Sequence, residues 1–180
     1  MSIKGQMLSA VFLGALLVGC STSATKSPDV TPQIRQSLDQ AGLKSVDVKQ
    51  DRDKGVVTLS GDVNADTDKA QAESIAKSIA GTEVVSNQIA VRPPGDQSAT
   101  KDADSALDSG IEQNVKAMLI QHKLNHDVNY DVKNGVVTLT GKVNSQSKRS
   151  STEQLTAAIP NVKQVVNELQ VKNQKATSSR

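Results

Sequence analysis

The sequence predicts an α+β protein made of two tandem small two-layer α/β sandwiches, each with the order helix, strand, strand, helix, strand. Three observations support this fold class: a repeated segment, alternating apolar residues typical of strands, and apolar residues at helical spacing. The repeated segment is residues 55–64 (GVVTLSGDVN), which returns 80 positions later as residues 135–144 (GVVTLTGKVN). Two copies are too few for a solenoid array, and a module of about 60 residues can fold alone.

Each copy opens with apolar side chains that recur at helical spacing. Apolar residues three and four positions apart lie on one face of a helix, so both segments are predicted to be amphipathic helices. Gly42 follows the first of them and is a suitable stop signal. The two apolar stripes are Ile34, Leu38 and Ala41 in the first copy and Ile111, Val115, Met118 and Leu119 in the second.

A β-hairpin follows the first helix in each copy, because apolar residues there alternate along the chain. Asn134-Gly135 is a strong signal for a two-residue type I′ turn, since both positions tolerate positive φ. The strands are expected at residues 46–48 and 56–63 in the first copy and at residues 128–132 and 136–143 in the second. Glycines are expected to shape both hairpins: Gly55 and Gly135 in the turns, and Gly61 and Gly141 within strands, where we expect a helix to cross closely.

A second amphipathic helix and a final strand complete each copy. The final strands share the pattern V-x-N-x-[IL]-x-V, whose alternation predicts one buried face. Helices and strands that each have one apolar side pack as a two-layer sandwich. The helices are expected over residues 67–80 and 147–159, ended by Gly81 and Pro160, and the strands over residues 83–91 and 163–171.

The hairpin pattern G-V-V-T-L-x-G-x-V, the final-strand pattern and the order of the elements together resemble the BON domain of OsmY-like periplasmic proteins. Both copies, residues 31–92 and 111–172, match over nearly their whole length. The resemblance implies a non-enzymatic module that attaches to membranes and supports envelope integrity or osmotic stress tolerance.

Three segments outside the copies are polar and lack apolar periodicity. They have too little apolar surface to offset the entropy lost on ordering the chain. We expect a tether over residues 20–30, a flexible interdomain linker over residues 93–110 and a flexible tail over residues 173–180. The two domains are then expected to move relative to each other unless the sequence hides an interface between them, so docking of the domains stays open.

The N-terminal segment has the three-part layout of a secretory signal. Lys4 precedes an apolar run over residues 7–18, which is too short for a bilayer because spanning needs about 20 residues. Cys20, the one cysteine of the chain, ends this run in a pattern that resembles a bacterial lipobox. The resemblance implies removal of residues 1–19, acylation (palmitate) of Cys20 and, because Ser21 follows, an outer-membrane position facing the periplasm. A soluble secretory signal with a chance cysteine is the alternative.

Residue patterns typical of catalysis or metal binding are scarce in the rest of the chain. No other cysteine, Gly-rich phosphate loop or serine elbow occurs. His122 and His126 are four positions apart, but no third ligand lies near them in sequence, so two surface histidines are the simpler interpretation. We therefore expect no enzymatic activity, no cofactor and no metal. Tyr130 is the one aromatic residue after Cys20, which argues against nucleic acid binding by stacking.

The two copies differ in charge although they share a pattern. Residues 34–92 carry eight Lys and Arg against nine Asp and Glu, whereas residues 111–172 carry eight against five, a formal charge of +3. Ile120 lies about 180° from Ile111 around the predicted helix, so the core stripe cannot bury it. A basic surface with an exposed apolar side chain suits the headgroup layer of an anionic membrane. The expected headgroup contacts are Lys116, Ile120, Lys123, Lys148 and Arg149. Drift in surface charge, or packing of Ile120 on the other domain, is the alternative.

The sequence thus favours a lipid-anchored envelope protein that binds membrane phospholipid, preferably with anionic headgroups. A second hypothesis is a periplasmic chaperone-like or adaptor protein, which would bind outer-membrane protein clients through its exposed final strands. A structural or adhesion role is a third. The residue patterns leave the oligomeric state open.

Overall fold

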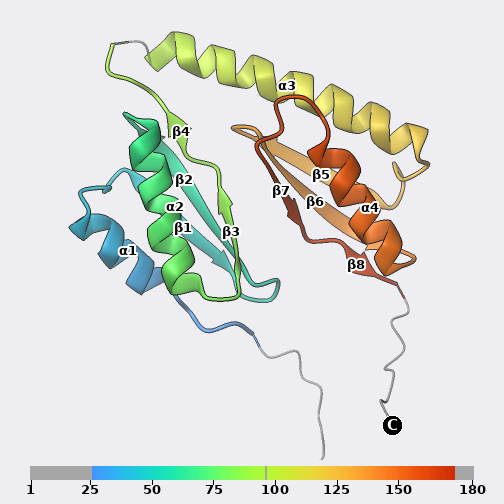
Figure 1. Ribbon diagram of the computed structural model, residues 1–180, viewed down its shortest axis with the longest axis horizontal. Coiled ribbons are helices and arrows are strands. Elements are labelled where there is room, and N and C mark those ends of the chain that lie inside the picture. Colours follow the sequence, from blue (N-terminus) through green and yellow to red (C-terminus); the bar gives the residue numbers. More distant parts are fainter. Residues whose placement is uncertain (1–25, 96, 173–180) are drawn as a thin grey trace, which may run out of the picture.

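A computed structural model describes residues 26–95 and 97–172, which fold into two domains with the predicted order of elements (Figure 1). Cys20, the signal segment and the polar tail lie outside the described residues. The first domain contains α1 (Thr31–Gln40), β1 (Val46–Asp51), β2 (Val56–Val63), α2 (Asp66–Ala80), β3 (Val84–Asn87) and β4 (Ala90–Val91). The second contains α3 (Gln97–Gln121), β5 (Val128–Lys133), β6 (Val136–Val143), α4 (Gln146–Ala157), β7 (Gln164–Asn167) and β8 (Gln170–Val171).

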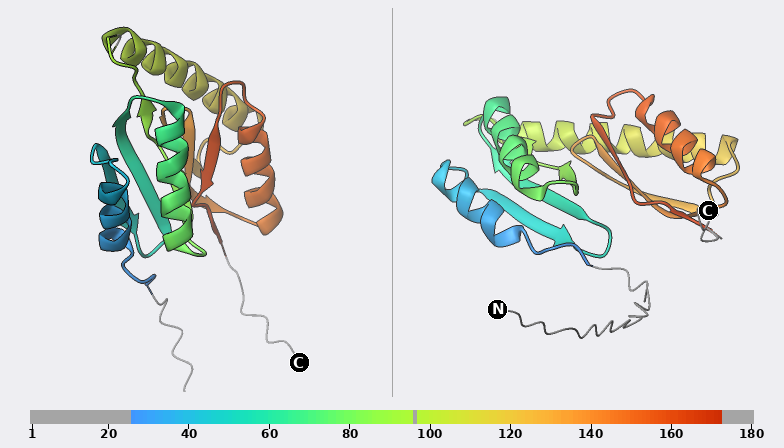
Figure 2. Two further views of the ribbon diagram at one scale, coloured as in Figure 1. Left: turned by 60° about the vertical axis from the view of Figure 1, so that its left-hand side comes forward. Right: turned by 60° about the horizontal axis from the view of Figure 1, so that its bottom comes forward.

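Each domain is a mixed sheet with two helices packed on one face, so the predicted α+β class and the repeat are confirmed (Figures 1 and 2). In the first domain β1 pairs antiparallel with one edge of β2, and β3 and β4 both pair parallel with its other edge. Strands β5 to β8 repeat this arrangement around β6. The central strand of each sheet is therefore the second strand of the predicted hairpin.

Aliphatic side chains fill the space between each sheet and its helices. Alternate residues of β2 and β6 point into this layer, as the period of a strand requires. Burying each large aliphatic side chain stabilises a domain by about 1.5–3 kcal/mol, which matters here because aromatic side chains are nearly absent. The most deeply buried residues are Ile34, Leu38, Val57, Leu59 and Ile89 in the first core and Ile111, Val115, Leu119, Val137 and Leu139 in the second.

The glycines of the hairpins act partly as predicted. Asn134 and Gly135 have φ of +51° and +81°, as a type I′ turn requires, so that prediction is confirmed. Gly61 and Gly141 also have positive φ and a close neighbour, but the neighbour is not a helix. A Cβ at Gly141 would overlap the carbonyl oxygen of Asp127, just before β5, and a Cβ at Gly61 would overlap the equivalent carbonyl before β1. The predicted helix crossing is wrong, because the close approach comes from the adjacent strand.

The final strand of each copy is interrupted at its signature asparagine, whereas the sequence predicted a continuous strand. In the second domain the Asn167 side chain accepts a hydrogen bond from the Leu169 N–H group (3.2 Å), which forms an Asx turn between β7 and β8. Its Nδ2 donates to the Arg149 carbonyl (3.2 Å) and to a Glu153 carboxylate oxygen (2.8 Å). The asparagine thus breaks the strand and ties it to α4.

The predicted flexible linker is wrong over most of its length, because residues 97–110 form the first part of α3. This helix of 25 residues continues without a break into the predicted amphipathic segment and lies across one end of both sheets (Figure 1). Once the packed C-terminal half has formed, each further residue without proline extends a helix at little cost. Asp108 fixes the extension, since its carboxylate accepts the N–H groups of Asn134 and Gly135 at 2.7 and 2.8 Å.

The two domains dock against each other through the sheet faces that point away from the helices. Val56 of β2 packs with Val136 of β6 and Val166 of β7 in a buried cluster. These three positions alternate with core residues along their strands, which places them on the opposite face from the cores. The sequence prediction of independently moving domains did not anticipate this contact.

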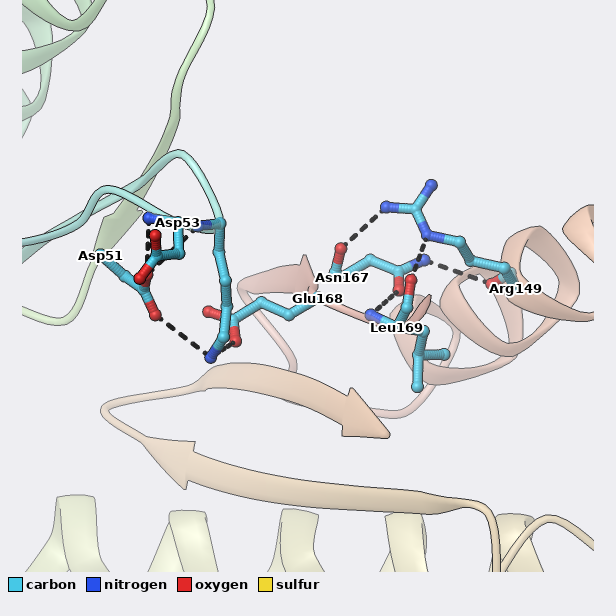
Figure 3. A network of polar contacts seen from close by, with 7 residues as sticks. Asp51, Asp53, Arg149, Asn167, Glu168 and Leu169 are labelled. Atoms are coloured by element: carbon cyan, nitrogen blue, oxygen red, sulfur yellow. Dashed lines mark hydrogen bonds and ion pairs between the residues drawn. The ribbon is translucent and has the colours of Figure 1, made fainter. Parts of the chain in front are cut away.

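Two polar contacts across the interface are related by the repeat. The Lys54 ammonium lies 2.6 Å from a carboxylate oxygen of Glu168, and Asn134 Nδ2 donates to the Gln88 carbonyl oxygen at 2.6 Å. Lys54 and Asn134 occupy the same position of the hairpin turn in the two copies, and Gln88 and Glu168 the same position of the final strand. Exchanging the copies therefore exchanges the contacts, as expected of a two-fold interface. Figure 3 shows Glu168 reaching toward the turn that carries Asp51 and Asp53.

Candidate functional site

Three residues near the end of α3 form an exposed basic and apolar surface, which we call the α3 surface: Lys116, Ile120 and Lys123. Ile120 is 54% exposed, so its predicted exposure is confirmed and it does not pack on the first domain. Both lysines are exposed, and within the described ranges neither side chain has a hydrogen-bond or ion-pair partner. The α3 surface thus presents two free cations beside an apolar side chain.

A groove of about 330 Å³ adjoins the α3 surface, between the helix and the edge strand β5. Lys116, Leu119 and Ile120 line one wall. Val128 and Tyr130 of β5 line the other, together with Asn125 and Asn129. Tyr130 is half-buried and is the one aromatic side chain among the described residues. The groove thus combines an amphipathic ring and aliphatic side chains with one cation, Lys116, at its wall.

The corresponding place in the first domain is built differently. Arg35, which occupies the position of Lys116, donates from Nη2 to the Val48 carbonyl oxygen at 3.1 Å and so links α1 to its edge strand. The first domain has Val48 where strand register places Tyr130 in the second. It has Asp39 where the second domain has Ile120. The side chains that make this groove apolar and basic are therefore specific to the second domain. Sequence reasoning missed Tyr130 and the groove, although alignment of the two copies would have revealed the substitutions.

Comparison with known proteins places both domains in one family. A model of the BON domain matches residues 27–93 and 107–173. The chain belongs to the BON-domain family. The similar proteins include Osmotically-inducible protein Y of Escherichia coli (strain K12), 31% identical over 153 residues that cover 79% of this chain and 71% of that protein.

Two solved structures of CdsD, a structural protein of the Type III secretion system of Chlamydia trachomatis, also align with this BON protein. Both alignments have a TM-score of 0.33 and 16% identity, and they cover 79% of this chain. The chain spans 65% and 61% of the two CdsD structures.

Lys123 of the second BON domain holds an unusual backbone conformation. Its φ is +55°, and it follows α3 at the position where the first BON domain has Gly42, whose φ is +80°. The Leu124 N–H group donates to the Leu119 carbonyl oxygen at 2.8 Å, which completes a Schellman cap. A glycine is the usual residue at such a position, so the second BON domain carries a cation at an energetic cost.

Lys123→Gly is expected to raise the free energy of unfolding by about 0.5–1 kcal/mol, because glycine adopts positive φ without strain. Urea denaturation measures this change. The reciprocal variant Gly42→Lys places a lysine at the matched position of the first BON domain and is expected to destabilise it by a similar amount. A lower urea midpoint for Lys123→Gly would contradict the assignment of backbone strain.

Arg149 has a different role from the predicted headgroup contact. Its Nε donates to the Leu169 carbonyl oxygen and its Nη2 to the Asn167 carbonyl oxygen, both at 2.9 Å (Figure 3). These bonds attach α4 to the break between β7 and β8. Lys69, the equivalent residue of the first BON domain, donates to the Ile89 carbonyl oxygen at 2.7 Å. Burial lowers the pKa of Lys69, which fits a structural rather than a surface position.

Lys148 lines a different groove from the one beside the α3 surface. It is half-buried and lines a separate groove of about 400 Å³ between the end of α3 and α4, together with His122, Ser151 and Leu155. The structure therefore brings Lys116, Ile120 and Lys123 together and leaves Lys148 and Arg149 outside this group. No group of three or more His, Cys, Asp and Glu in the described ranges could hold a metal ion. The same part of the chain has no helix long and apolar enough to cross a membrane.

Proposed function

We propose that the α3 surface of the second BON domain binds anionic phospholipid headgroups, with Ile120 inserted among the upper acyl carbons. The observation that carries this proposal is the 54% exposure of Ile120 between two lysines that have no partner among the described residues, beside the open groove that contains Tyr130. The first BON domain has the same fold without this surface, and its equivalent of Ile120 is an aspartate.

The expected interaction is weak for an isolated domain. Each lysine near an anionic membrane contributes about 1 kcal/mol, and apolar groups contribute about 0.8 kcal/mol for each methylene that leaves water. Such an affinity becomes effective only if the protein is already held near the membrane, because tethering raises the local concentration of the binding surface.

The proposed tether is the acylated N-terminus. Cys20 would carry acyl chains, and the segment that follows would let the second BON domain reach the headgroup layer. A lipid-anchored envelope protein of this kind would support envelope integrity under osmotic stress, in line with the osmotic induction for which its Escherichia coli relative is named.

Lipid binding is tested by co-sedimentation of residues 21–180, which retain every element that the structure describes. We expect binding to vesicles that contain phosphatidylglycerol, weaker binding at higher salt, and little binding to zwitterionic vesicles. Lys116→Glu with Lys123→Glu is expected to reduce the binding constant at least about tenfold, since each reversal replaces attraction by repulsion. Ile120→Asp, the residue of the first BON domain, tests the apolar contribution.

Reversal of two lysines away from the α3 surface, Lys44→Glu with Lys49→Glu in the first BON domain, gives the control with the same change in charge. Both control lysines are exposed. If both double variants lost vesicle binding equally, the net charge of the protein would explain the binding, and the assignment to the α3 surface would be refuted. The anchor is tested separately: Cys20→Ser in the full chain is expected to abolish the acyl mass.

A further inference from the structure

Strand β3 presents one backbone edge to the second BON domain. In a parallel ladder, alternate residues direct both their N–H and C=O groups to the partner strand. Val84 donates its N–H to the Gly55 carbonyl oxygen at 2.9 Å. Gln88, four residues later, likewise donates its N–H to the Leu59 carbonyl oxygen of β2 at 2.9 Å. Val85 and Asn87 therefore direct their backbone groups away from β2. This is the arrangement of a strand edge to which a further strand could be added.

The side chain of Gln164 occupies that edge. Its Nε2 donates to the Val85 carbonyl oxygen at 2.7 Å, and its Oε1 accepts from the Asn87 N–H group at 3.1 Å. A primary amide offers one donor and one acceptor at the spacing of a peptide group, and these are the two bonds that one residue of an added strand would form. Gln164 therefore imitates a neighbouring strand at β3.

The repeat shows that this contact is specific to one side of the interface. The first BON domain has Val84 at the position of Gln164, and a valine side chain cannot form either bond. Val84 is also 45% exposed, although it is a large apolar residue in a strand. Its side chain alternates with those of Val85 and Asn87, so it lies on the face of β3 that the second BON domain approaches.

The interface that holds Gln164 in place has an apolar and a polar part. It combines the cluster of Val56, Val136 and Val166 with the paired contacts of the hairpin turns. The hydrogen bond to Glu168 raises the pKa of Lys54. The Lys54 side chain is 44% exposed, whereas that of Glu168 is 9% exposed, so water reaches the ammonium and screens the pair only in part. Relative motion of two domains in one chain is the default expectation unless their interface is large and hydrophobic.

We propose that the β3 edge is a strand-addition site for an extended peptide segment with alternating apolar and polar side chains, and that the docked second BON domain closes this site with Gln164. The backbone of the segment would bond to Val85 and Asn87. Its apolar side chains would lie beside Val84 and Val56, which separation of the domains exposes. Its polar side chains would point to the helix-covered face of the sheet, toward Lys69 and Glu73 of α2. Such alternation is typical of strands with one apolar face.

The test uses the full chain in detergent micelles and a short fluorescent peptide that alternates valine and threonine. Gln164→Val installs the residue of the first copy and is expected to tighten peptide binding about fivefold or more, because the competing side-chain amide is gone. Glu168→Lys weakens docking at a different residue and is expected to act in the same direction. Gln170→Val makes the same chemical change at an exposed position of β8 and is expected to leave binding unchanged.

Hydrogen exchange locates the bound peptide. We expect slower exchange at Asn87 on peptide addition, faster exchange there in Gln164→Val without peptide, and no binding of a peptide with N-methylated alternate residues. Absence of peptide binding by both Gln164→Val and Glu168→Lys would overturn the proposal. Protection of the β7 edge at Val165 and Asn167 in place of β3 would overturn it as well. Vesicle binding by the α3 surface is a separate readout, and the Gln164 variant is expected to retain it.

Discussion

Gly141→Ala is expected to lower the free energy of unfolding of the second BON domain by about 3 kcal/mol or more, from backbone strain at positive φ together with overpacking. The φ of Gly141 is +123°, which side chains rarely adopt, and a Cβ would overlap the Asp127 carbonyl oxygen. Backbone cannot move aside as the end of a flexible side chain can. Thermal and urea denaturation measure the change, and Gly61→Ala is expected to affect the first BON domain in the same way.

Gly110 provides the matched control for these substitutions. It lies within α3, and nothing is found within 4 Å of the place that a Cβ would occupy. Gly110→Ala is expected to raise stability by about 0.5–1 kcal/mol, because alanine favours the helix over the unfolded chain. Equal effects of Gly110→Ala and Gly141→Ala would contradict the structure of the second hairpin.

Asn87→Asp is expected to destabilise the first BON domain by about 2 kcal/mol or more at neutral pH, through lost hydrogen bonds of a buried group and the approach of two carboxylates. Asn87 Nδ2 donates to a Glu73 carboxylate oxygen at 2.8 Å and to the Lys69 carbonyl oxygen at 3.3 Å. An aspartate keeps only the acceptor toward the Ile89 N–H group. Asn64→Asp, at an exposed residue, is the control and is expected to change stability by less than about 0.5 kcal/mol.

The cost of Asn87→Asp is expected to shrink as the pH falls from 7 toward 4. The hydrogen bond from Asn87, followed by that from Lys77, lowers the pKa of Glu73 below its ordinary value of 4.5. This contribution to wild-type stability is complete above pH 4.5 and is lost as the pH falls through the folded pKa. In Asn87→Asp, protonation relieves the repulsion between the two carboxylates, so this contribution to the stability of the variant rises as the pH falls. A constant difference between the two proteins over this range would refute the contact.

The elements that could be predicted from the sequence are those defined by local patterns. Alternation located β2 and β6, and the Asn134-Gly135 pair gave the correct turn, because both signals depend on neighbours along the chain. The break at the signature asparagine was missed, since the alternating pattern continues through it while the backbone bonds do not. The extension of α3 was missed because its polar composition suits a linker, and the anchoring of Asp108 depends on a turn 26 residues away.

The candidate site was predicted in part. The angular position of Ile120 was enough to predict its exposure, because the helix is amphipathic. The structural role of Arg149 was not predicted, since nothing local shows that its guanidinium reaches two carbonyl groups 18 and 20 residues away. The interface between the domains depends on contacts between residues 46 or more positions apart, such as the 77 that separate Asn87 from Gln164, which no local pattern encodes.

The two-fold relation between the copies has a consequence for how the protein could diversify. In a homodimer every substitution appears on both sides of the axis, so a change that helps one side is imposed on the other. Here both sides belong to one chain and can mutate independently. Position 84 is valine while position 164 is glutamine, and position 39 is aspartate while position 120 is isoleucine. The two modules can therefore differ at matched positions, with a valine beside the β3 edge in the first and a basic apolar groove in the second.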